Sequence, residues 1–461
     1  MSCLWDSIAR SGNPVSGKFH GRGASVALSA LAAGSTFGSA LESLRGRSVL
    51  IATRDQLPAA LALIELDGVA RRMVLCTPDL TPEQLAGVAA TAEADAIVLE
   101  ERSSISAPAS LTPYVVAPQP QPGTAPRRAG TVTEWILLTS GTTGAPKLVA
   151  HTLESLGGAL ATQAPSDTQS IWSTFYDIRR YGGLQIYLRA VLSGSPLVLS
   201  SSDEPVHDFL IRAAAAGVTH ISGTPSHWRR ALMSGEAPLL TPRYVRLSGE
   251  VADQTLLDNL RAAYPHARIA HAFASTEAGV AFDVNDGLAG FPLTFVDNPS
   301  GEIELKVVDH TLRIRSGRTA ARYLGSAPSV LASDDGFVDT GDMVELVDGR
   351  YYFRGRMGGV INVGGLKVYP EEVESVLNAD PRVRMSLVRA RRNPITGSVV
   401  VADVVLADPA SAAAADSPDL LKRDLLGACR RALAAHKVPA MLRFVPALEF
   451  TAAGKLVRPS A

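Results

Sequence analysis

Residues 138–147 read Leu-Thr-Ser-Gly-Thr-Thr-Gly-Ala-Pro-Lys and continue the apolar segment 135–138. Glycines let the backbone bend until several N–H groups face one anion, and the Ser and Thr hydroxyls add further donors. The closing Lys147 adds a mobile positive charge, so the stretch suits a polyphosphate. The common phosphate loop differs, because it requires a hydroxyl residue after the lysine and Leu148 follows here. Composition alone leaves a phosphate-binding loop and a flexible surface loop equally open.

Short apolar segments alternate with helical patterns on the N-terminal side of this loop. Strands are predicted at 48–52, 72–76 and 96–100, and helices at 56–66 and 83–93. Continuous apolar strands separated by helices are typical of a parallel sheet that is covered on both faces. The sequence therefore predicts an α/β fold.

The C-terminal side of the loop divides into three parts. A second α/β block runs from about 171 to 281, and the segment 301–315 then changes to the two-residue alternation of β-strands. Beyond residue 357, strands are mixed with predicted helices at 371–377 and 420–435. A β subdomain and a terminal α+β unit are therefore expected after the parallel sheets.

Composition limits the classes of partner and compartment. The 461 residues carry a net charge of −1, with 46% hydrophobic and 19% charged residues, which is an ordinary globular balance. This charge gives no electrostatic reason to expect nucleic acid or an anionic membrane as a partner. The cysteines Cys3, Cys76 and Cys429 are odd in number and far apart, which fits a reducing cytosol. No apolar run reaches the ~18 residues of a membrane helix, and no signal peptide is visible, so a cytoplasmic protein is expected.

Four further clusters follow the loop along the chain. Thr276-Glu277 sets a carboxylate beside a hydroxyl, which can hold Mg²⁺, and Phe273 offers a ring for stacking on a purine. Asp342 closes a Thr-Gly-Asp turn whose carboxylate could accept two ribose hydroxyls. Each cluster alone is more simply explained as a turn, a helix start or a tail. The joint occurrence of all five in this order is much less easily explained. The four clusters are 271–277, 339–342, 354–374 and 451–458.

Together the five motifs resemble the superfamily of adenylate-forming enzymes, which comprises acyl- and aryl-CoA ligases, nonribosomal-peptide adenylation domains and luciferases. The likeness covers roughly residues 135–458, and more loosely the α/β region before them. It implies ATP-dependent activation of a carboxylic acid to an acyl-adenylate with release of pyrophosphate, and then transfer to a thiol. It also implies an N-terminal ATP- and acid-binding domain, residues 1–355, and a small mobile C-terminal domain, residues 356–461, that carries the catalytic lysine.

The resemblance assigns roles to individual positions. Thr276 and Glu277 would contact phosphate and Mg²⁺, and Asp342 and Arg356 would hold the ribose. Lys455 would bridge the substrate carboxylate and the α-phosphate, where charge builds in the transition state. The remaining positions assigned by the resemblance are Thr139, Ser140, Gly141, Thr142, Thr143, Gly144 and Lys147 around the β- and γ-phosphates, Gly249, Glu250 and Phe273 around adenine, and Gly364 and Gly365 along the pantetheine channel.

The acid pocket departs from the family pattern at one position and leaves two residues open to interpretation. Many CoA ligases carry a histidine in the segment that aligns with residues 174–183, and none is present here. Asp177 falls near the position where amino-acid-activating relatives keep an aspartate for the substrate ammonium, but a surface pairing with Arg179 or Arg180 is the simpler interpretation. His271 is either a pocket residue or a hydrogen-bonded core histidine. The expected substrate-binding residues are Phe175, Tyr176, Asp177, His271 and Ala274.

We therefore predict an AMP-forming acid–thiol ligase that makes a CoA thioester from an aryl or short acyl acid. Its cofactors would be ATP, Mg²⁺ and coenzyme A. Two alternatives stay open. One is a stand-alone adenylation enzyme that loads an aryl or amino acid onto the phosphopantetheine of a separate carrier protein. The other is a catalytically silent nucleotide-binding protein. Gly358 occupies the position of the family's hinge aspartate or lysine, so we expect a looser hinge.

Overall fold

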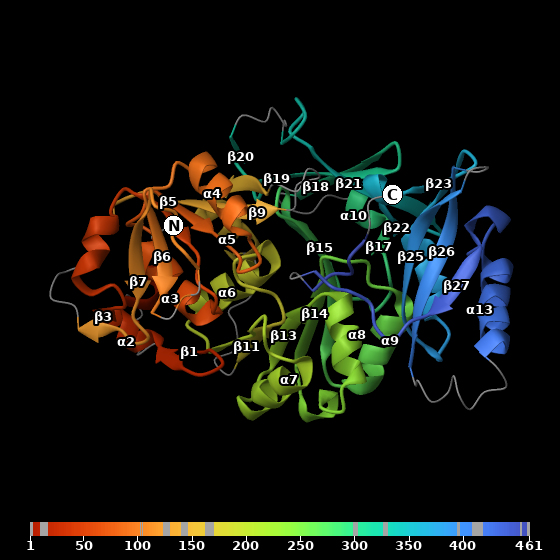
Figure 1. Ribbon diagram of the computed structural model, residues 1–461, viewed down its shortest axis with the longest axis horizontal. Coiled ribbons are helices and arrows are strands. Elements are labelled where there is room, and N and C mark those ends of the chain that lie inside the picture. The colour runs from red at the N-terminus through yellow and green to blue at the C-terminus, as the bar shows by residue number, and fades with distance from the viewer. Residues whose placement is uncertain are drawn as a thin grey trace.

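The computed structural model describes most of the chain (Figure 1). Two large sheets with their helices form the N-terminal two thirds, followed by a smaller β unit and a C-terminal α+β unit. The described residues are 3–9, 17–101, 103, 105–122, 130–139, 146–161, 170–297, 303–325, 331–393, 397–407, 418–451 and 454–458.

The first large sheet positions the candidate site. Its central strands run parallel, and the antiparallel β16 and β2 close its two edges. In spatial order, its described strands are β16 (Gly279–Val284), β15 (Arg268–Ser275), β14 (Tyr244–Ser248), β13 (His220–Gly223), β11 (Trp172–Thr174), β12 (Leu197–Leu199), β1 (Lys18–His20) and β2 (Ser25–Ala27).

The second large sheet contains the strands that flank the glycine-rich loop. Strands β9 and β10 form an antiparallel hairpin in which Lys147 lies opposite Thr139, so the two ends of the loop are held together. In spatial order, its described strands are β20 (Arg322–Leu324), β10 (Lys147–His151), β9 (Glu134–Thr139), β5 (Arg72–Leu75), β4 (Ser48–Ile51), β6 (Ala96–Glu100) and β7 (Thr112–Val116).

Helices separate and cover the two sheets. The helix α3 (Gln56–Leu66) is apolar on almost every side and lies in the core between the sheets, together with α5 (Leu153–Ala161) and α6 (Tyr181–Ser193). Its buried Glu65 accepts hydrogen bonds from Ser35 and Thr36, which satisfy the carboxylate. The outer faces are covered by α4 (Pro82–Thr91) on one sheet and by α7 (Val206–Ala215), α8 (Pro225–Met233) and α9 (Gln254–Ala263) on the other.

The shorter elements of the described chain are α1 (Leu4–Ala9), α2 (Leu28–Ala33), η1 (Gly38–Leu44), η2 (Ala237–Leu239), α10 (Thr294–Asp297), β3 (Gly34–Ser35) and β8 (Gln121–Pro122).

The β unit and the C-terminal unit complete the chain. The β unit contains β17 (Phe291–Pro292), β22 (Arg350–Arg356), β21 (Val338–Val347), β19 (Thr311–Ser316) and β18 (Ile303–Val308). The C-terminal unit contains η3 (Met357–Gly359), β23 (Ile361–Val363), β24 (Leu366–Val368), α11 (Pro370–Asn378), β25 (Val383–Asn393), β26 (Gly397–Leu406), α13 (Pro418–Ala432), η4 (Ala435–Lys437) and β27 (Met441–Phe444).

The structure confirms the predicted α/β class and the β subdomain. The predicted helix 56–66 coincides with α3, and the other predicted elements agree to within a few residues. Among the described residues, no helix combines the length and the apolarity that crossing a membrane requires.

Candidate functional site

The candidate site lies beyond the carboxyl ends of the parallel strands in the first sheet, where open α/β sheets bind their ligands. Strand β14 ends at Ser248 and leads into Gly249-Glu250, and the adjacent β15 ends at Ser275 and leads into Thr276-Glu277. Because Ser248 pairs with Ala272 in parallel register, both segments leave the same edge of the sheet. The fold therefore brings the cluster 271–277 next to Gly249-Glu250, the segment that the resemblance assigns to adenine.

The C-terminal segment 454–458 returns to this edge from the far end of the chain (Figure 1). The Gly454 carbonyl accepts a hydrogen bond of 3.1 Å from Thr224 Oγ1, and the Leu456 N–H donates to Glu250 Oε1 at 3.3 Å. A Cβ on Gly249 would lie 3.3 Å from Cε and 3.7 Å from Nζ of Lys455. The lysine ammonium thus sits directly over a backbone position without a side chain.

The surroundings of Lys455 disfavour its charge in the absence of an anion. The residue stays accessible to solvent, but protein atoms crowd around its ammonium. This partial burial lowers the pKa of Lys455; Glu250 and Asp342 oppose the shift, whereas Arg356 and Arg180 add to it. A phosphate or carboxylate bound beside Lys455 would favour its charged form again, as expected of a cation that stabilises a developing negative charge.

Asp342 and Arg356 form a cross-strand pair close enough to Lys455 to affect its charge. They lie opposite each other on β21 and β22, with Nε of Arg356 3.2 Å from Oδ1 of Asp342. Burial raises the pKa of the Asp342 carboxyl, and the charge of Arg356 opposes that shift. The Arg356 side chain remains 68% exposed. Its other N–H groups, together with the Asp342 carboxylate, could therefore hydrogen-bond a polyhydroxyl group such as ribose.

Tyr323 on β20 links two of the predicted phosphate-side residues. Its hydroxyl donates to Glu277 Oε1 at 3.3 Å, and the Lys147 ammonium lies 5.5 Å from the centre of its ring. The neighbouring Thr276 carbonyl is held by His151 Nε2 at 2.7 Å. Lys147, Thr276 and Glu277 therefore belong to one contiguous group. The predicted loop residues Ser140, Gly141, Thr142, Thr143 and Gly144 lie outside the described residues.

A magnesium ion would fit Glu277 only together with the nucleotide. Mg²⁺ prefers six oxygen ligands and is commonly held by one or two carboxylates plus phosphates and waters. Within the described part of the chain, no cluster of three or more metal-ligating His, Cys, Asp or Glu side chains occurs. Glu277, beside the Thr276 hydroxyl, supplies an oxygen donor of the required type, and the phosphates would supply others.

Phe273 provides the expected aromatic surface. Its ring is stacked on Phe353, with centroids 5.2 Å apart and an interplanar angle of 5°, and on Phe282 at 5.8 Å. These neighbours fix the orientation of the Phe273 ring on β15. The predicted pantetheine glycines form the turn of the β23–β24 hairpin: Gly364 and Gly365 have φ of 58° and 86°, and Gly365 N–H donates to Asn362 Oδ1 at 2.9 Å.

The predicted acid-pocket residues have varied surroundings. Phe175 stacks on His227 at 5.4 Å and belongs to the core beneath α7 and α8. Tyr176 is buried and donates its hydroxyl hydrogen to the Ser248 carbonyl at 2.6 Å. Ala274 is half-buried on β15 opposite Val280. His271 is bound through Nε2 to the Leu288 carbonyl at 2.9 Å, which is the geometry of a core histidine.

Asp177 is committed to an ion pair. Its oxygens lie 2.8 Å from Nε and 2.6 Å from Nη2 of Arg179, whose side chain is only 1% exposed and also donates to the Thr53 carbonyl. Burial alone would raise the pKa of Asp177, but the Arg179 charge outweighs it and the pKa lies below its ordinary value. The structure therefore does not support Asp177 as a substrate-ammonium site, and the alternative pairing with Arg179 is present inside the protein rather than on its surface.

Sequence reasoning missed Tyr323 and His227. Tyr323 lies in the short strand β20, which carries no motif of its own. His227 is buried on α8, where burial lowers its pKa to about 3, and its ring lies against Gly454. Both contacts join segments far apart in the chain, so no local signal could have revealed them.

Comparisons with known proteins agree with this arrangement. The AMP-binding enzyme family matches residues 47–318, and the AMP-binding enzyme C-terminal domain matches residues 372–455. The chain belongs to the AMP-binding enzyme family.

Individual relatives include 2-succinylbenzoate–CoA ligases. The chain is 30% identical to the one from Salmonella typhimurium over 60% of its own length and 57% of that ligase. It is 30% identical to the one from Geobacillus kaustophilus over 70% of its length and 67% of that ligase. The matched region thus covers 57% of the length of the first ligase and 67% of the length of the second.

Solved structures share the fold. The o-succinylbenzoate CoA synthetase of Bacillus subtilis, in complex with an acyl-adenylate intermediate, superimposes with a TM-score of 0.74 at 20% identity over 99% of this chain and 97% of that one. The anthranilate CoA ligase AuaEII, in complex with anthranoyl-AMP, gives a TM-score of 0.78 at 18% identity over 98% and 95%. The likeness extends through the C-terminal unit.

Gly454→Ala is expected to prevent the C-terminal segment from docking. Gly454 has φ of 70°, and an added Cβ would overlap the imidazole ring of His227. Loss of one preorganised electrostatic contact typically costs ~3–4 kcal/mol, so if Lys455 makes such a contact, acid-dependent ATP–pyrophosphate exchange should fall about 10²-fold or more while the fold persists. The control is Gly427→Ala on α13. Unchanged exchange in Gly454→Ala would contradict the docked geometry.

Tyr323→Phe is expected to weaken nucleotide binding without disturbing the fold. The change removes the hydrogen bond to Glu277. Such a bond has a net value of about 0.5–1.5 kcal/mol, so kcat/KM for ATP should fall roughly 2- to 12-fold. Kinetics at several Mg²⁺ concentrations measure this. Tyr114→Phe, which loses a hydrogen bond to Ser43, is the control, and an equal effect in both variants would refute a special role.

Asp177→Asn is expected to destabilise the protein without changing which acid is preferred. Removal of one partner from a buried pair costs about 3–5 kcal/mol, measurable by urea denaturation. Asp258→Asn, which breaks an exposed pair with Arg261, should cost no more than about 1 kcal/mol. A stable Asp177→Asn variant with an altered acid preference would instead place Asp177 in the substrate site.

Proposed function

We propose that this protein activates a small carboxylic acid with ATP, forms an acyl-adenylate and pyrophosphate, and transfers the acyl group to the thiol of coenzyme A. The observation that carries the proposal is the convergence of Lys455 with Gly249-Glu250 and the Asp342–Arg356 pair. A nucleotide-binding protein without catalysis has no need to bring a terminal lysine to the place where the α-phosphate would lie.

Each residue has a defined part in the first half-reaction. A carboxylate oxygen of the acid attacks the α-phosphorus, the bond from phosphorus to the bridging oxygen breaks, and pyrophosphate leaves with that electron pair. Lys455 would stabilise the charge that develops on the phosphoryl and carboxyl oxygens. Asp342 and Arg356 would hold the ribose, and Phe273 would contact adenine. Lys147 would position the departing pyrophosphate.

Magnesium would supply charge neutralisation of the phosphates when it is bound at Glu277. The side chains that would surround this position are Thr276, through its hydroxyl, and Tyr323, through its hydrogen bond to Glu277. His151 would keep the Thr276–Glu277 turn in place by binding the Thr276 carbonyl.

The second half-reaction would require the C-terminal domain, which we place at residues 356–461, to move. The thiol sulfur attacks the acyl carbon, the thiol proton is lost, and AMP leaves with the mixed-anhydride oxygen. Among the described residues, no atom lies within 4 Å of where a Cβ on Gly364 or Gly365 would stand, so this turn is open. We propose that rotation about the segment near Gly358 brings the turn to the pantetheine channel.

Two details of the proposal concern the thiol that accepts the acyl group and the identity of the acid. The 2-succinylbenzoate–CoA ligases among the relatives support coenzyme A and an aryl acid. A peptide synthetase from Salinispora arenicola that is 29% identical over 60% of this chain supports a carrier protein as the alternative acceptor. We propose a reducing, cytoplasmic setting, in which the three cysteines stay free thiols.

Lys455→Ala is expected to lower acid-dependent ATP–pyrophosphate exchange about 10²- to 10³-fold, because one preorganised electrostatic contact in the transition state is lost. A panel of aryl, alkyl and amino acids that includes 2-succinylbenzoate identifies the acid, and mass analysis with coenzyme A identifies the thioester. Lys422→Ala on the surface of α13 is the control. Absence of exchange with every acid would overturn the proposal in favour of a silent nucleotide-binding protein.

A further inference from the structure

Lys455 is carried by a short hairpin close to the end of the chain. Phe450 and Leu456 face each other in an antiparallel bridge, and the Thr451 N–H donates a hydrogen bond of 2.8 Å to the Lys455 carbonyl. We call this element the terminal hairpin; its described residues are 449–451 and 454–457. Because the two sides of the hairpin are hydrogen-bonded to each other, a contact that holds Phe450 also holds the backbone of Lys455.

Helix α8 and the residue before it form the surface on which the terminal hairpin lies. Thr224 Oγ1 donates to the Gly454 carbonyl at 3.1 Å, and the His227 ring lies against Gly454. One turn further along, the guanidinium carbon of Arg230 lies 4.5 Å from the centre of the Phe450 ring. The hairpin is therefore held at both of its sides by one helix.

The same helix also reaches the body of the C-terminal unit. Met233, the last residue of α8, accepts the Nε–H of Arg384 on β25 through its sulfur. The positions of α8 that meet the C-terminal unit are three residues apart, so successive members are neighbours on the helix surface. They are Thr224, His227, Arg230 and Met233.

Arg230 is the one charged member of this row, and the fold of its own helix does not explain it. Its Nε is buried and has no hydrogen-bond partner within the part of the chain that the structure describes. Burial lowers the pKa of Arg230, and Glu250 opposes that shift. The neighbouring Arg229, by contrast, is ion-paired with Asp253. Burying a guanidinium is costly unless it is paired, and the face of the Phe450 ring offers a cation–π partner.

This combination of a cost and a gain suits a contact that opens repeatedly. In the docked arrangement Arg230 gains the Phe450 ring and loses water, and the two contributions oppose each other. When the hairpin leaves, the guanidinium regains its water. An apolar residue at position 230 would gain the contact without the desolvation cost and would hold the hairpin more tightly.

We propose that Arg230 is a positioning residue whose contact with Phe450 sets how much of the time Lys455 is docked, and that it thereby sets the ratio of the two half-reactions. This inference rests on the proposed acid activation and on the proposed movement of the C-terminal unit, and it adds the residue that governs the balance between them. Adenylate formation requires the docked hairpin, and thioester formation requires its departure. A change at Arg230 should therefore move the two rates in opposite directions.

The test measures both half-reactions and the docking itself. ATP–pyrophosphate exchange is followed with the acid of the panel described above that exchanges fastest. Thioester formation is followed from the chemically prepared adenylate of that acid, with coenzyme A and with phosphopantetheine, the arm that both proposed acceptors carry. Hydrogen exchange of peptides that span residues 441–458 reports docking without any substrate, and thermal denaturation shows whether each variant is folded.

Loosening variants remove one partner of the contact. Arg230→Ala and Phe450→Leu should each lower pyrophosphate exchange about 2- to 30-fold, the range expected for loss of one cation–π contact. Thioester formation from the prepared adenylate should not fall, and hydrogen exchange of 441–458 should become faster. Phe450→Leu keeps an apolar side chain on the hairpin, so it tests the ring face alone and serves if Arg230→Ala does not fold.

Arg230→Leu should have the opposite effect, because an apolar side chain packs on the ring without losing a hydrated charge. Hydrogen exchange of 441–458 should become slower, pyrophosphate exchange should be at least as fast as in the wild type, and thioester formation should fall about 5-fold or more. Introduced into Phe450→Leu, the same change should restore pyrophosphate exchange. Arg229→Leu on the same helix is the matched control and should leave the ratio of the two rates unchanged.

The outcomes distinguish this inference from the proposed function. If both rates fall together in folded Arg230→Ala and Phe450→Leu, or if Arg229→Leu shifts their ratio as far as Arg230→Leu does, the positioning role is overturned and acid activation stands. Failure of Arg230→Leu to restore exchange in Phe450→Leu also overturns it. Exchange with no acid at all overturns both proposals.

Discussion

The candidate site depends on one docking interaction, in which the C-terminal segment 454–458 packs against the edge of the first sheet. The Glu250 carboxylate binds groups from both sides of this contact. Glu250 accepts the Ser226 N–H at 2.9 Å and its hydroxyl at 3.0 Å, and it also accepts the Leu456 N–H at 3.3 Å. The start of α8, the end of β14 and the terminal segment are therefore joined through one side chain. Neither domain alone contains the arrangement around Lys455.

The close approach requires glycine on both sides of the contact. Gly249 has φ of 85° and faces the Lys455 stem, and Gly454 has φ of 70° and faces His227. Arg458 also ties the segment to its own domain, with Nη1 and Nη2 at 2.8 and 2.7 Å from the Glu374 carboxylate. In the rotation proposed above, we expect Lys455 to move together with the C-terminal unit, because Arg458 ties the segment to that unit.

The sequence predicted features that depend on neighbouring residues and missed contacts between residues that lie far apart in the chain. The helix 56–66 was predictable because its residues are apolar on almost every side and are flanked by Asp55 and Asp67, and α3 is that helix. The resemblance assigned Asp342 and Arg356 to the same ribose, and the structure places them side by side. By contrast, Tyr323 and His227 act through contacts with residues more than forty positions away. Asp177 could not be decided from sequence, because only packing shows that Arg179 is buried beside it.

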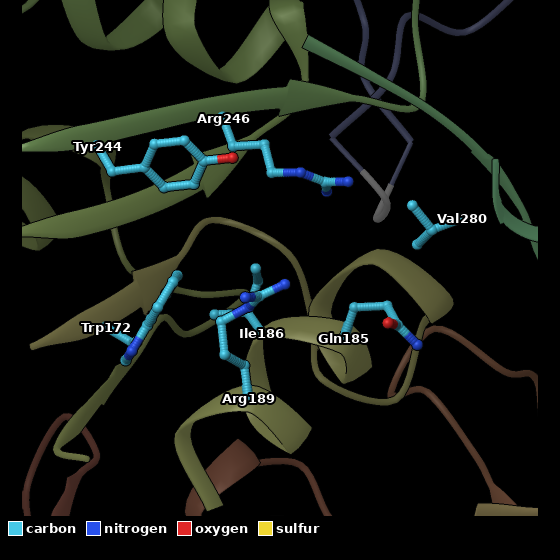
Figure 2. Close-up of a pocket in the computed structure, with 7 residues that line it drawn as sticks. All are labelled: Trp172, Gln185, Ile186, Arg189, Tyr244, Arg246 and Val280. Carbon is cyan, nitrogen blue, oxygen red and sulfur yellow. The ribbon is translucent and has the colours of Figure 1, made fainter. Parts of the chain in front are cut away.

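Strand alternation explains why Arg246 faces helix α6 from the middle of an otherwise apolar sheet (Figure 2). Tyr244 and Arg246 alternate along β14 and face α6 together, whereas the intervening Val245 and Leu247 face the opposite core under α8 and α9. Arg246 is 8% exposed, and burying a guanidinium is costly unless it is paired. Asp283 offsets one charge at that position.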